Sequence, residues 1–155
     1  MNVDLYPAGV EVVFSEPEAP MARRLRDRVD GHEVVEAGAE ALPFGDAEFD
    51  TVVCTLVLCT VPDVPAALGE IRRVLHPEGR LLFAEHVRSD DTDRARWQDR
   101  LTPVWRFCGR GCHPNRDTAA ALQDAGFAFD RLDEGRLPKA PPIVRPMITG
   151  VARSA

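Results

Sequence analysis

The chain has 155 residues, of which 45% are apolar and 28% are charged, and its formal net charge is −6. This length fits one domain that buries a core without disulfides or a structural metal, and the acidic balance argues against a polyanionic partner such as nucleic acid. No window approaches the ~20 apolar residues of a membrane span, and no signal-peptide pattern precedes the first strand, so we expect a cytoplasmic protein.

The N-terminal part contains a strand that leads directly into a helix. Residues 10–15 form an apolar strand that ends at Glu16, and a helix with an apolar stripe at Met21, Leu25 and Val29 follows. A carboxylate at such a strand end suits a ribose, because it accepts hydrogen bonds from both hydroxyl groups. The alternative is an acid that interacts with the helix dipole.

A short third strand is predicted over residues 32–36, followed by a loop over residues 37–44. The small residues Ala37, Gly38 and Ala39 allow a flat ring to approach the backbone closely, although a plain turn has the same composition.

The stretch from Phe49 to Val61 organises the rest of the chain. Thr51 to Val61 is almost wholly apolar and β-branched, which is typical of a strand covered on both faces in a parallel sheet. A helix over residues 63–75 follows, stopped by Pro77-Glu78-Gly79, and a second apolar strand begins at Leu81. This strand–helix–strand unit predicts an α/β domain with a mostly parallel sheet and helices on both faces, in which ligands bind beyond the carboxyl ends of the strands. Residues 55–60 and 85–86 are therefore expected to face the site.

The C-terminal part begins with an amphipathic helix over residues 93–107, with a kink expected at Pro103. Its two tryptophans, Trp97 and Trp105, suit either the core or the wall of a pocket. A further helix over residues 118–125 precedes two strands, residues 127–132 and 147–153, which are expected to pair antiparallel at the sheet edge.

Four cysteines, Cys54, Cys59, Cys108 and Cys112, are expected to be reduced, because two of them lie in or beside the central stretch and nothing indicates secretion. The spacing from Cys108 to Cys112 and the following histidine is not that of the usual zinc sites, so we predict no metal.

Several segments resemble class I S-adenosylmethionine-dependent methyltransferases, a Rossmann-like fold. The segments Glu40-Ala41-Leu42-Pro43-Phe44 and Phe49-Asp50 are typical of the ubiquinone/menaquinone-biosynthesis-like branch. Closer still is the methyltransferase-like 7 group of thiol methyltransferases. The matching segments there are residues 52–59, Glu85-His86-Val87, Gly111-Cys112 and Val144-Arg145-Pro146.

The resemblance implies S-adenosyl-L-methionine as cofactor and assigns roles to matching positions. The acid that holds the ribose corresponds to Glu16, beside Pro17, and the loop on the adenine corresponds to Gly38, Ala39 and Glu40. Gly38 stands where many relatives have an Asp that contacts the adenine amine. The strand end under the methionine corresponds to Cys54, Thr55 and Leu56.

The same resemblance places His86 near the transferred methyl group, as candidate general base or as an anchor of the loop after its strand. The acceptor pocket would be walled by Cys59, Trp97, Trp105, Phe107 and Cys112. An apolar, uncharged small-molecule acceptor is expected, with a thiol, carbon or hydroxyl nucleophile.

One departure from the family is the missing Gly-rich turn that follows its first strand. We therefore expect residues 1–155 to form a single, N-terminally truncated methyltransferase domain in which the first central strand is missing, with Met1 either an internal methionine or the start of a remnant. Two apolar strand edges would be left unpaired, which favours homo-oligomers.

Two alternatives to methyl transfer remain open. One is a non-catalytic remnant that acts through its open sheet edge. The other is a nicotinamide-dependent reductase, which would use Glu16 in the same way but for which the sequence offers no Tyr-x3-Lys set.

Overall fold

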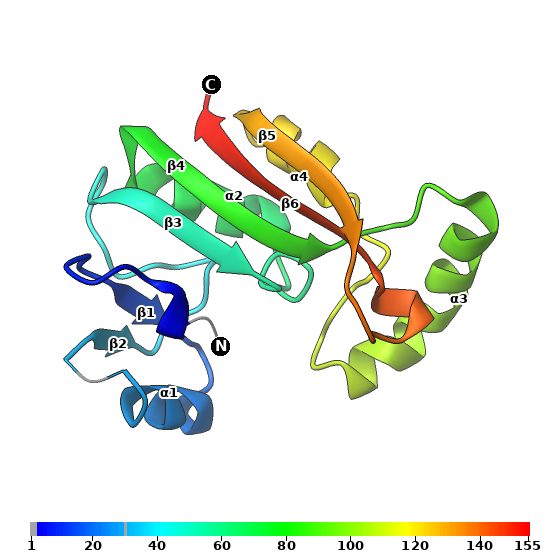
Figure 1. Cartoon of the computed structure of the whole chain (residues 1–155), viewed down its shortest axis with the longest axis horizontal. Helices are drawn as coiled ribbons and strands as arrows, with labels where there is room; N and C mark the ends of the chain where they lie inside the picture. The colour runs from blue at the N-terminus through cyan, green and yellow to red at the C-terminus, as the bar shows by residue number, and fades with distance from the viewer. Residues whose placement is uncertain (1–2, 30) are drawn as a thin grey trace.

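The structure, a computed structural model, describes residues 3–29 and 31–155 (Figure 1), so the expectation about Met1 lies outside it. Within this range the strands form two separate sheets. A parallel pair consists of β1 (Val13–Ser15) and β2 (Glu33–Val35). The four-stranded sheet has the order β3-β4-β6-β5, built from β3 (Phe49–Thr55), β4 (Leu75–His86), β5 (Phe127–Arg136) and β6 (Pro146–Ser154).

The strand directions confirm the predicted α/β fold. β3 and β4 run parallel, whereas β6 runs antiparallel to both β4 and β5, which is the expected antiparallel C-terminal edge. β1 and β3 each have one edge without a strand partner among the described residues.

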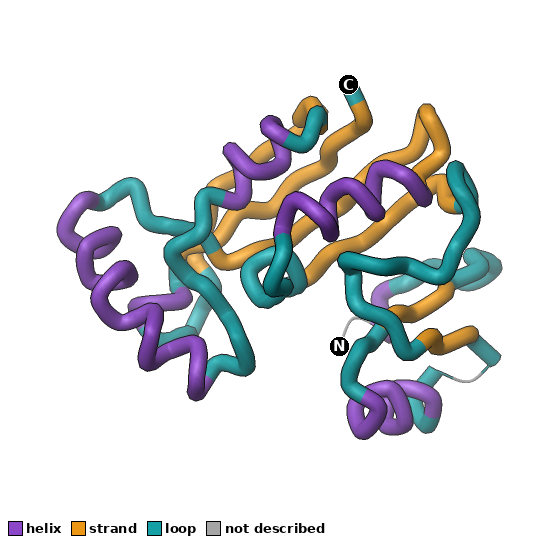
Figure 2. Tube along the Cα trace, turned by 180° about the vertical axis from the view of Figure 1, so that it is seen from behind, coloured by secondary structure: helices purple, strands orange, loops and turns teal. Residues whose placement is uncertain are grey.

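The helices differ in what they cover. α1 (Ala19–Arg26) packs beside β2, whereas α2 (Val64–Val74) and α4 (Thr118–Asp124) lie on one face of the four-stranded sheet, as seen from behind in Figure 2. α3 (Thr92–Cys108) stands beyond the ends of β4 and β6 (Figure 1), near a short 3₁₀ helix, η2 (Pro142–Val144). A second 3₁₀ helix, η1 (Val3–Leu5), lies near the N-terminus.

The main core lies between the four-stranded sheet and its helices. Leu68 and Ile71 of α2 pack with Leu81 of β4 and Leu122 of α4, and none of these side chains is more than 1% exposed. Burying each one contributes about 1.5–3 kcal/mol relative to exposure. The apolar spacing that predicted α2 is therefore the spacing of its buried face.

The central strand is shorter than predicted, because it ends at Thr55 and not at Val61. Leu56 has a φ of 57°, in the left-handed region, and the chain turns away after its amide donates to the carbonyl of Ala84. Residues 56–61 are therefore a partly buried turn with strand-like composition.

The helix ends where predicted, but residues 77–79 lie within β4, which begins at Leu75 directly after α2. Its register against β3 shifts between the pairs Phe49–Leu75 and Thr51–Arg80, so residues 76–79 form an irregularity at the exposed start of the strand.

The N-terminal segment bridges the two sheets. The ring of Tyr6 meets Phe14 of β1 edge-on, with 5.8 Å between centroids, and burial together with the nearby Cys54 thiol of β3 raises the pKa of Tyr6. Figure 1 shows this segment running between β1 and β3. The predicted strand over residues 10–15 is accordingly reduced to Val13–Ser15.

Gly150 and Gly69 provide a matched test of the packing. A Cβ added at Gly150 of β6 would clash with the carbonyl of Arg131 and lie 2.6 Å from the ring of Phe83, whereas one at Gly69 of α2 would meet nothing within 4 Å. We expect Gly150→Ala to lower the free energy of unfolding by about 1–3 kcal/mol and Gly69→Ala to raise it by about 0.5–1 kcal/mol. Urea denaturation measures both, and equal effects would contradict this packing.

Candidate functional site

The carboxyl ends of β1, β2, β3 and β4 point to the same side of the molecule (Figure 1). Glu16, at the end of β1, has its amide bonded to the carbonyl of Val35 of β2, 3.0 Å away. Its side chain is half-buried, and Oε1 accepts from the amide of Glu18 at 3.0 Å. One of the two carboxylate oxygens thus supports the start of α1. This agrees with the alternative in which Glu16 interacts with the helix dipole.

Three segments far apart in the sequence adjoin here. Glu18 forms an ion pair with Arg110 at 3.2 Å, which links the start of α1 to the segment after α3. In that segment a Cβ at Gly111 would lie 3.4 Å from the carbonyl of Thr60, and the amide of His113 donates to the carbonyl of Cys59 at 2.6 Å. The start of α1, the segment 109–113 and the turn after β3 therefore share one region.

Glu85 of β4 holds that turn. Its side chain is fully buried, and its carboxylate accepts from the amides of Val57 and Cys59 at 2.9 and 3.0 Å. Burial raises the pKa of Glu85, and the two amides oppose this by stabilising the charged form. The turn is consequently fixed by a buried acid that donor groups surround.

The three residues predicted at the strand end differ in orientation. Cys54 is 4% exposed and belongs to the core beneath α2, so its side chain does not face a ligand at the strand end. Thr55 ends the strand, and Leu56, 38% exposed, has the strained left-handed backbone. Such strain at a strand end is common in binding sites.

The loop predicted to lie on the adenine is attached at both ends. The hydroxyl of Ser15 in β1 donates to the carbonyl of Ala37 at 2.6 Å, and the carboxylate of Glu40 accepts from the amide of Asp63 at 3.4 Å. Gly38 and Ala39 thus lie between the end of β1 and the start of α2.

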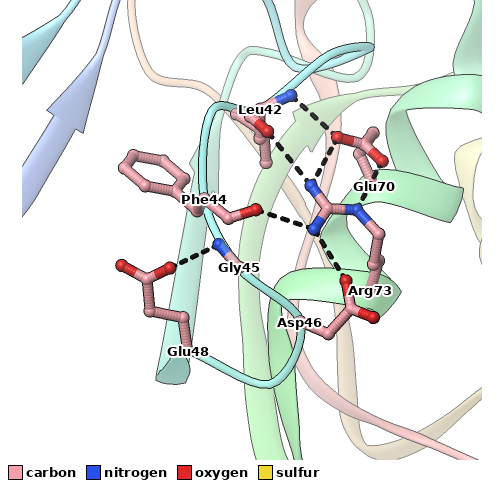
Figure 3. Close-up of polar contacts among 7 residues, drawn as sticks. All are labelled: Leu42, Phe44, Gly45, Asp46, Glu48, Glu70 and Arg73. Atoms are coloured by element: carbon pink, nitrogen blue, oxygen red, sulfur yellow. Dashed lines mark hydrogen bonds and ion pairs between the residues drawn. The ribbon is translucent and has the colours of Figure 1, made fainter.

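Two charged residues of α2 hold the following part of the same loop, residues 42–46 (Figure 3). Arg73 donates to the carbonyls of Phe44 and Leu42 at 2.7 and 3.0 Å, and its ion-pair partner Glu70 accepts from the amide of Leu42 at 2.8 Å. Asp46 pairs with the same guanidinium. These contacts lower the pKa of Glu70 to about 2, with the Arg73 hydrogen bond as the largest cause.

His86 lies at the carboxyl end of β4, next to Glu85 and on the opposite face because successive strand side chains alternate. It is 7% exposed, its Nδ1 has no hydrogen-bond partner among the described residues, and burial lowers its pKa. The imidazole is therefore neutral at neutral pH.

The predicted pocket residues do not all meet. Cys59, Cys112 and Trp105 pack together with Ala140 and Val144. Trp97, predicted as core or pocket wall, is 61% exposed, and the Phe107 ring is 91% exposed. The buried residues of α3 are instead Ala95, Gln98 and Thr102, which do not include Trp97 or Phe107.

Trp97 instead borders a groove of about 420 Å³ beside η2, lined by Asp91, Asp93, Arg94, Trp97, Gln98, Leu101, Pro142 and Ile143. A larger groove of about 560 Å³ lies between α2 and α4, on the helix-covered face and away from the strand ends. Neither groove includes the residues predicted to hold a cofactor.

The sequence prediction placed Glu85 at the site but did not include its hold on the turn, and it gave no role to Arg73 or Gln98. The side-chain amide of Gln98 donates to the carbonyls of Val87, Pro114 and Ile143. For Glu85 the available signal was an isolated polar side chain inside an apolar run, which must find partners when buried. Arg73, beside Arg72 and partly exposed, gave no such signal.

Two searches of the described residues are negative. Residues 3–29 and 31–155 contain no group of three or more His, Cys, Asp or Glu side chains arranged to hold a metal ion. Within the same ranges, every helix is too short or too polar to cross a membrane.

Residues 3–83, more than half of the chain, match the methyltransferase domain family. The chain belongs to this family. Human thiol S-methyltransferase TMT1A is 34% identical over 159 residues, which covers 97% of the chain and 65% of that protein. The ubiquinone/menaquinone biosynthesis C-methyltransferase UbiE of Hahella chejuensis is 42% identical over 85 residues, which covers 51% of the chain and 34% of UbiE. The chain thus spans less than two thirds of the length of these curated relatives.

The fold comparison agrees with the family. The crystal structure of an S-adenosylmethionine-dependent methyltransferase from Thermotoga maritima aligns with a TM-score of 0.72 at 21% identity and covers 99% of the chain and 76% of that structure. The resemblance drawn from the sequence is therefore confirmed, S-adenosylmethionine is the cofactor that family and fold imply, and the nicotinamide alternative is not favoured.

Replacement of Glu85 tests its hold on the turn. Glu85→Ala leaves the buried amides of Val57 and Cys59 without their acceptor, and we expect a loss of about 2–4 kcal/mol in the free energy of unfolding. Glu78→Ala, at an exposed position of the same strand, is the control and should change it by less than about 0.5 kcal/mol. Similar losses in both variants would show that Glu85 does not hold the turn.

Proposed function

We propose that the chain forms the cofactor-binding part of an S-adenosylmethionine-dependent methyltransferase with a small, apolar acceptor, a thiol being the first candidate. The supporting observation is the convergence of Glu16, the loop 37–42 and the turn after β3 at one end of the strands. The similarity to the human thiol S-methyltransferase TMT1A favours a thiol.

The chemistry of these residues fits the cofactor. Glu16 would accept the ribose hydroxyls with the carboxylate oxygen that does not support α1, Oε2. Pro17, directly after it, fixes the backbone there. Gly38, Ala39 and Glu40 would border the adenine, on a loop that Arg73 orders. The backbone of Cys54, Thr55 and Leu56 would lie along the methionine part.

Bound S-adenosylmethionine supplies an activated methyl group on a sulfonium, so the protein's task is mainly alignment of the nucleophile. His86, neutral at neutral pH and placed at the end of β4, would accept the acceptor's proton at a ring nitrogen. Cys59, Cys112 and Trp105 would wall the acceptor side, with Trp97 too far along α3 to share their cluster.

Location and assembly complete the proposal. We place the protein in the cytoplasm, acting on a small molecule. The free edges of β1 and β3 offer a surface for a second copy of the chain.

Cofactor binding is tested by calorimetry with S-adenosylhomocysteine and with NADH. We expect S-adenosylhomocysteine alone to bind, and Glu16→Gln to weaken it about 10-fold or more, because a hydrogen bond to a charged group contributes about 1.5–3 kcal/mol. Glu33→Gln, on the exposed start of β2, is the matched control and should bind as the unmodified chain does. Binding of NADH, or no binding of S-adenosylhomocysteine, would contradict the proposal.

The role of His86 is tested by the pH dependence of thiol methylation. Because burial lowers its pKa, His86 stays unprotonated somewhat below the ordinary histidine value of about 6.5. We expect kcat/KM to fall on the acid side only below that value, and His86→Gln to abolish this acid limb and reduce the rate by about 10²-fold or more. Formation of S-adenosylhomocysteine measures the rate, and an unchanged limb in the variant would assign the titration to another group.

A further inference from the structure

Two cysteines face one another beside the candidate site. The Sγ atoms of Cys59 and Cys112 lie 3.8 Å apart, although 53 residues separate them in the chain. Cys59 is 1% exposed and Cys112 is 8% exposed, and both thiols are free. They come from different segments, the turn after β3 and the loop after α3.

The backbone holds these two segments close together independently of the sulfur atoms. The amide of His113 donates to the carbonyl of Cys59, and the guanidinium of Arg116 donates to the carbonyl of Leu58, each at 2.6 Å. Gly111, with a φ of 86°, lets the loop pass the carbonyl of Thr60. The sulfur atoms need to approach by less than ~2 Å to reach the 2.05 Å of a disulfide. Side-chain rotation within a fixed frame is a small enough movement for this.

The surroundings make the two sulfur atoms unequal. Their mutual hydrogen bond lowers the pKa of Cys112, helped by the positive charge of Arg116, and raises that of Cys59. Cys112 is also the more exposed of the two. It is therefore the nucleophile of the pair, because the thiolate is the reactive form.

We propose that Cys59 and Cys112 form a reversible disulfide when the protein meets hydrogen peroxide. The Cys112 thiolate attacks one peroxide oxygen, the O–O bond breaks, and hydroxide leaves, giving a sulfenic acid. The sulfur of Cys59 then attacks the Cys112 sulfur, the S–O bond breaks, and water leaves with the proton of Cys59. Two thiols are oxidised and one peroxide is reduced.

The limited exposure of the pair selects the oxidant. A peroxide has nearly the size of water, whereas a large disulfide such as oxidised glutathione would have to enter a cluster that Trp105, Ala140 and Val144 close. Cys108 is exposed and lacks such a partner among the described cysteines, and Cys54 is buried in the separate core beneath α2. The cross-link is thus specific to one pair.

The cross-link would tie the turn that Glu85 holds to the loop that carries Arg110. Both segments border the region proposed for the cofactor and the acceptor. Oxidation would therefore fix the two walls of the pocket and remove both thiols from it.

Mass spectrometry of the peroxide-treated chain tests the proposal, with no need for cofactor. The expected result is a loss of two hydrogen atoms from the intact chain, a cross-linked peptide joining Cys59 to Cys112, and recovery of both thiols with dithiothreitol. Cys59→Ser and Cys112→Ser should each lose this peptide, whereas the control Cys108→Ser should retain it. Circular dichroism of each variant checks that it is folded.

Three results would overturn it. They are a cross-link through Cys108, over-oxidation of Cys112 in the unmodified chain while Cys59 remains reduced, and persistence of the two-hydrogen loss in folded Cys59→Ser. None of these results depends on methyl transfer, so a failure of the disulfide proposal is distinguishable from a failure of the proposed function.

Discussion

The carboxylate of Glu85 is removed from water and accepts the amide protons of Val57 and Cys59. A charged or polar group buried in this way is tolerated only when donors satisfy it, so the turn and the acid stabilise each other. This turn also positions Thr55 and Leu56 at the strand end and holds Cys59 against Cys112. The proposed cofactor region and the cysteine pair therefore depend on the same buried interaction, which joins neighbouring parallel strands at their carboxyl ends.

The parts of the fold that could be predicted from the sequence are those in which local pattern and tertiary packing agree. Helix α2 was predicted over residues 63–75 and occupies Val64–Val74, because its apolar spacing is the buried face and Asp63 caps its start. The antiparallel pair β5–β6 was also predicted, from two strand-like segments near the end of the chain. The predicted positions of Glu16 directly after β1 and of Thr55 at the end of β3 follow from the strand bounds, and whether they hold a cofactor stays a prediction.

The misses occur where a distant partner overrides the local pattern. Residues 56–61 have strand composition, but the long-range acceptor Glu85 stabilises a turn that no periodicity reveals. The alternation of side chains along β3 directs Cys54 into the core, so its proposed place beside the methionine part is that of its backbone. Trp97 follows the helical stripe of Trp105, yet the buried face of α3 is set by Gln98, which binds three carbonyls from separate segments.

The two sheets are joined by few interactions, and this bears on how a ligand would act. Both side chains of the ion pair between Glu18 and Arg110 are exposed to solvent, so the pair adds little stability. Further links among the described residues are the Tyr6 segment, the 3.4 Å hydrogen bond from the amide of Asp63 to Glu40, and the bonds of Arg73 and Glu70 to the loop at Leu42. A nucleoside cofactor held by Glu16 on one side and by the turn after β3 on the other would bridge the two units. Because such a ligand binds only when both units are in place, it would stabilise their arrangement by mass action, in proportion to RT ln(1 + [L]/Kd). If the proposed site holds the cofactor, the cofactor would itself complete the contact between the two sheets.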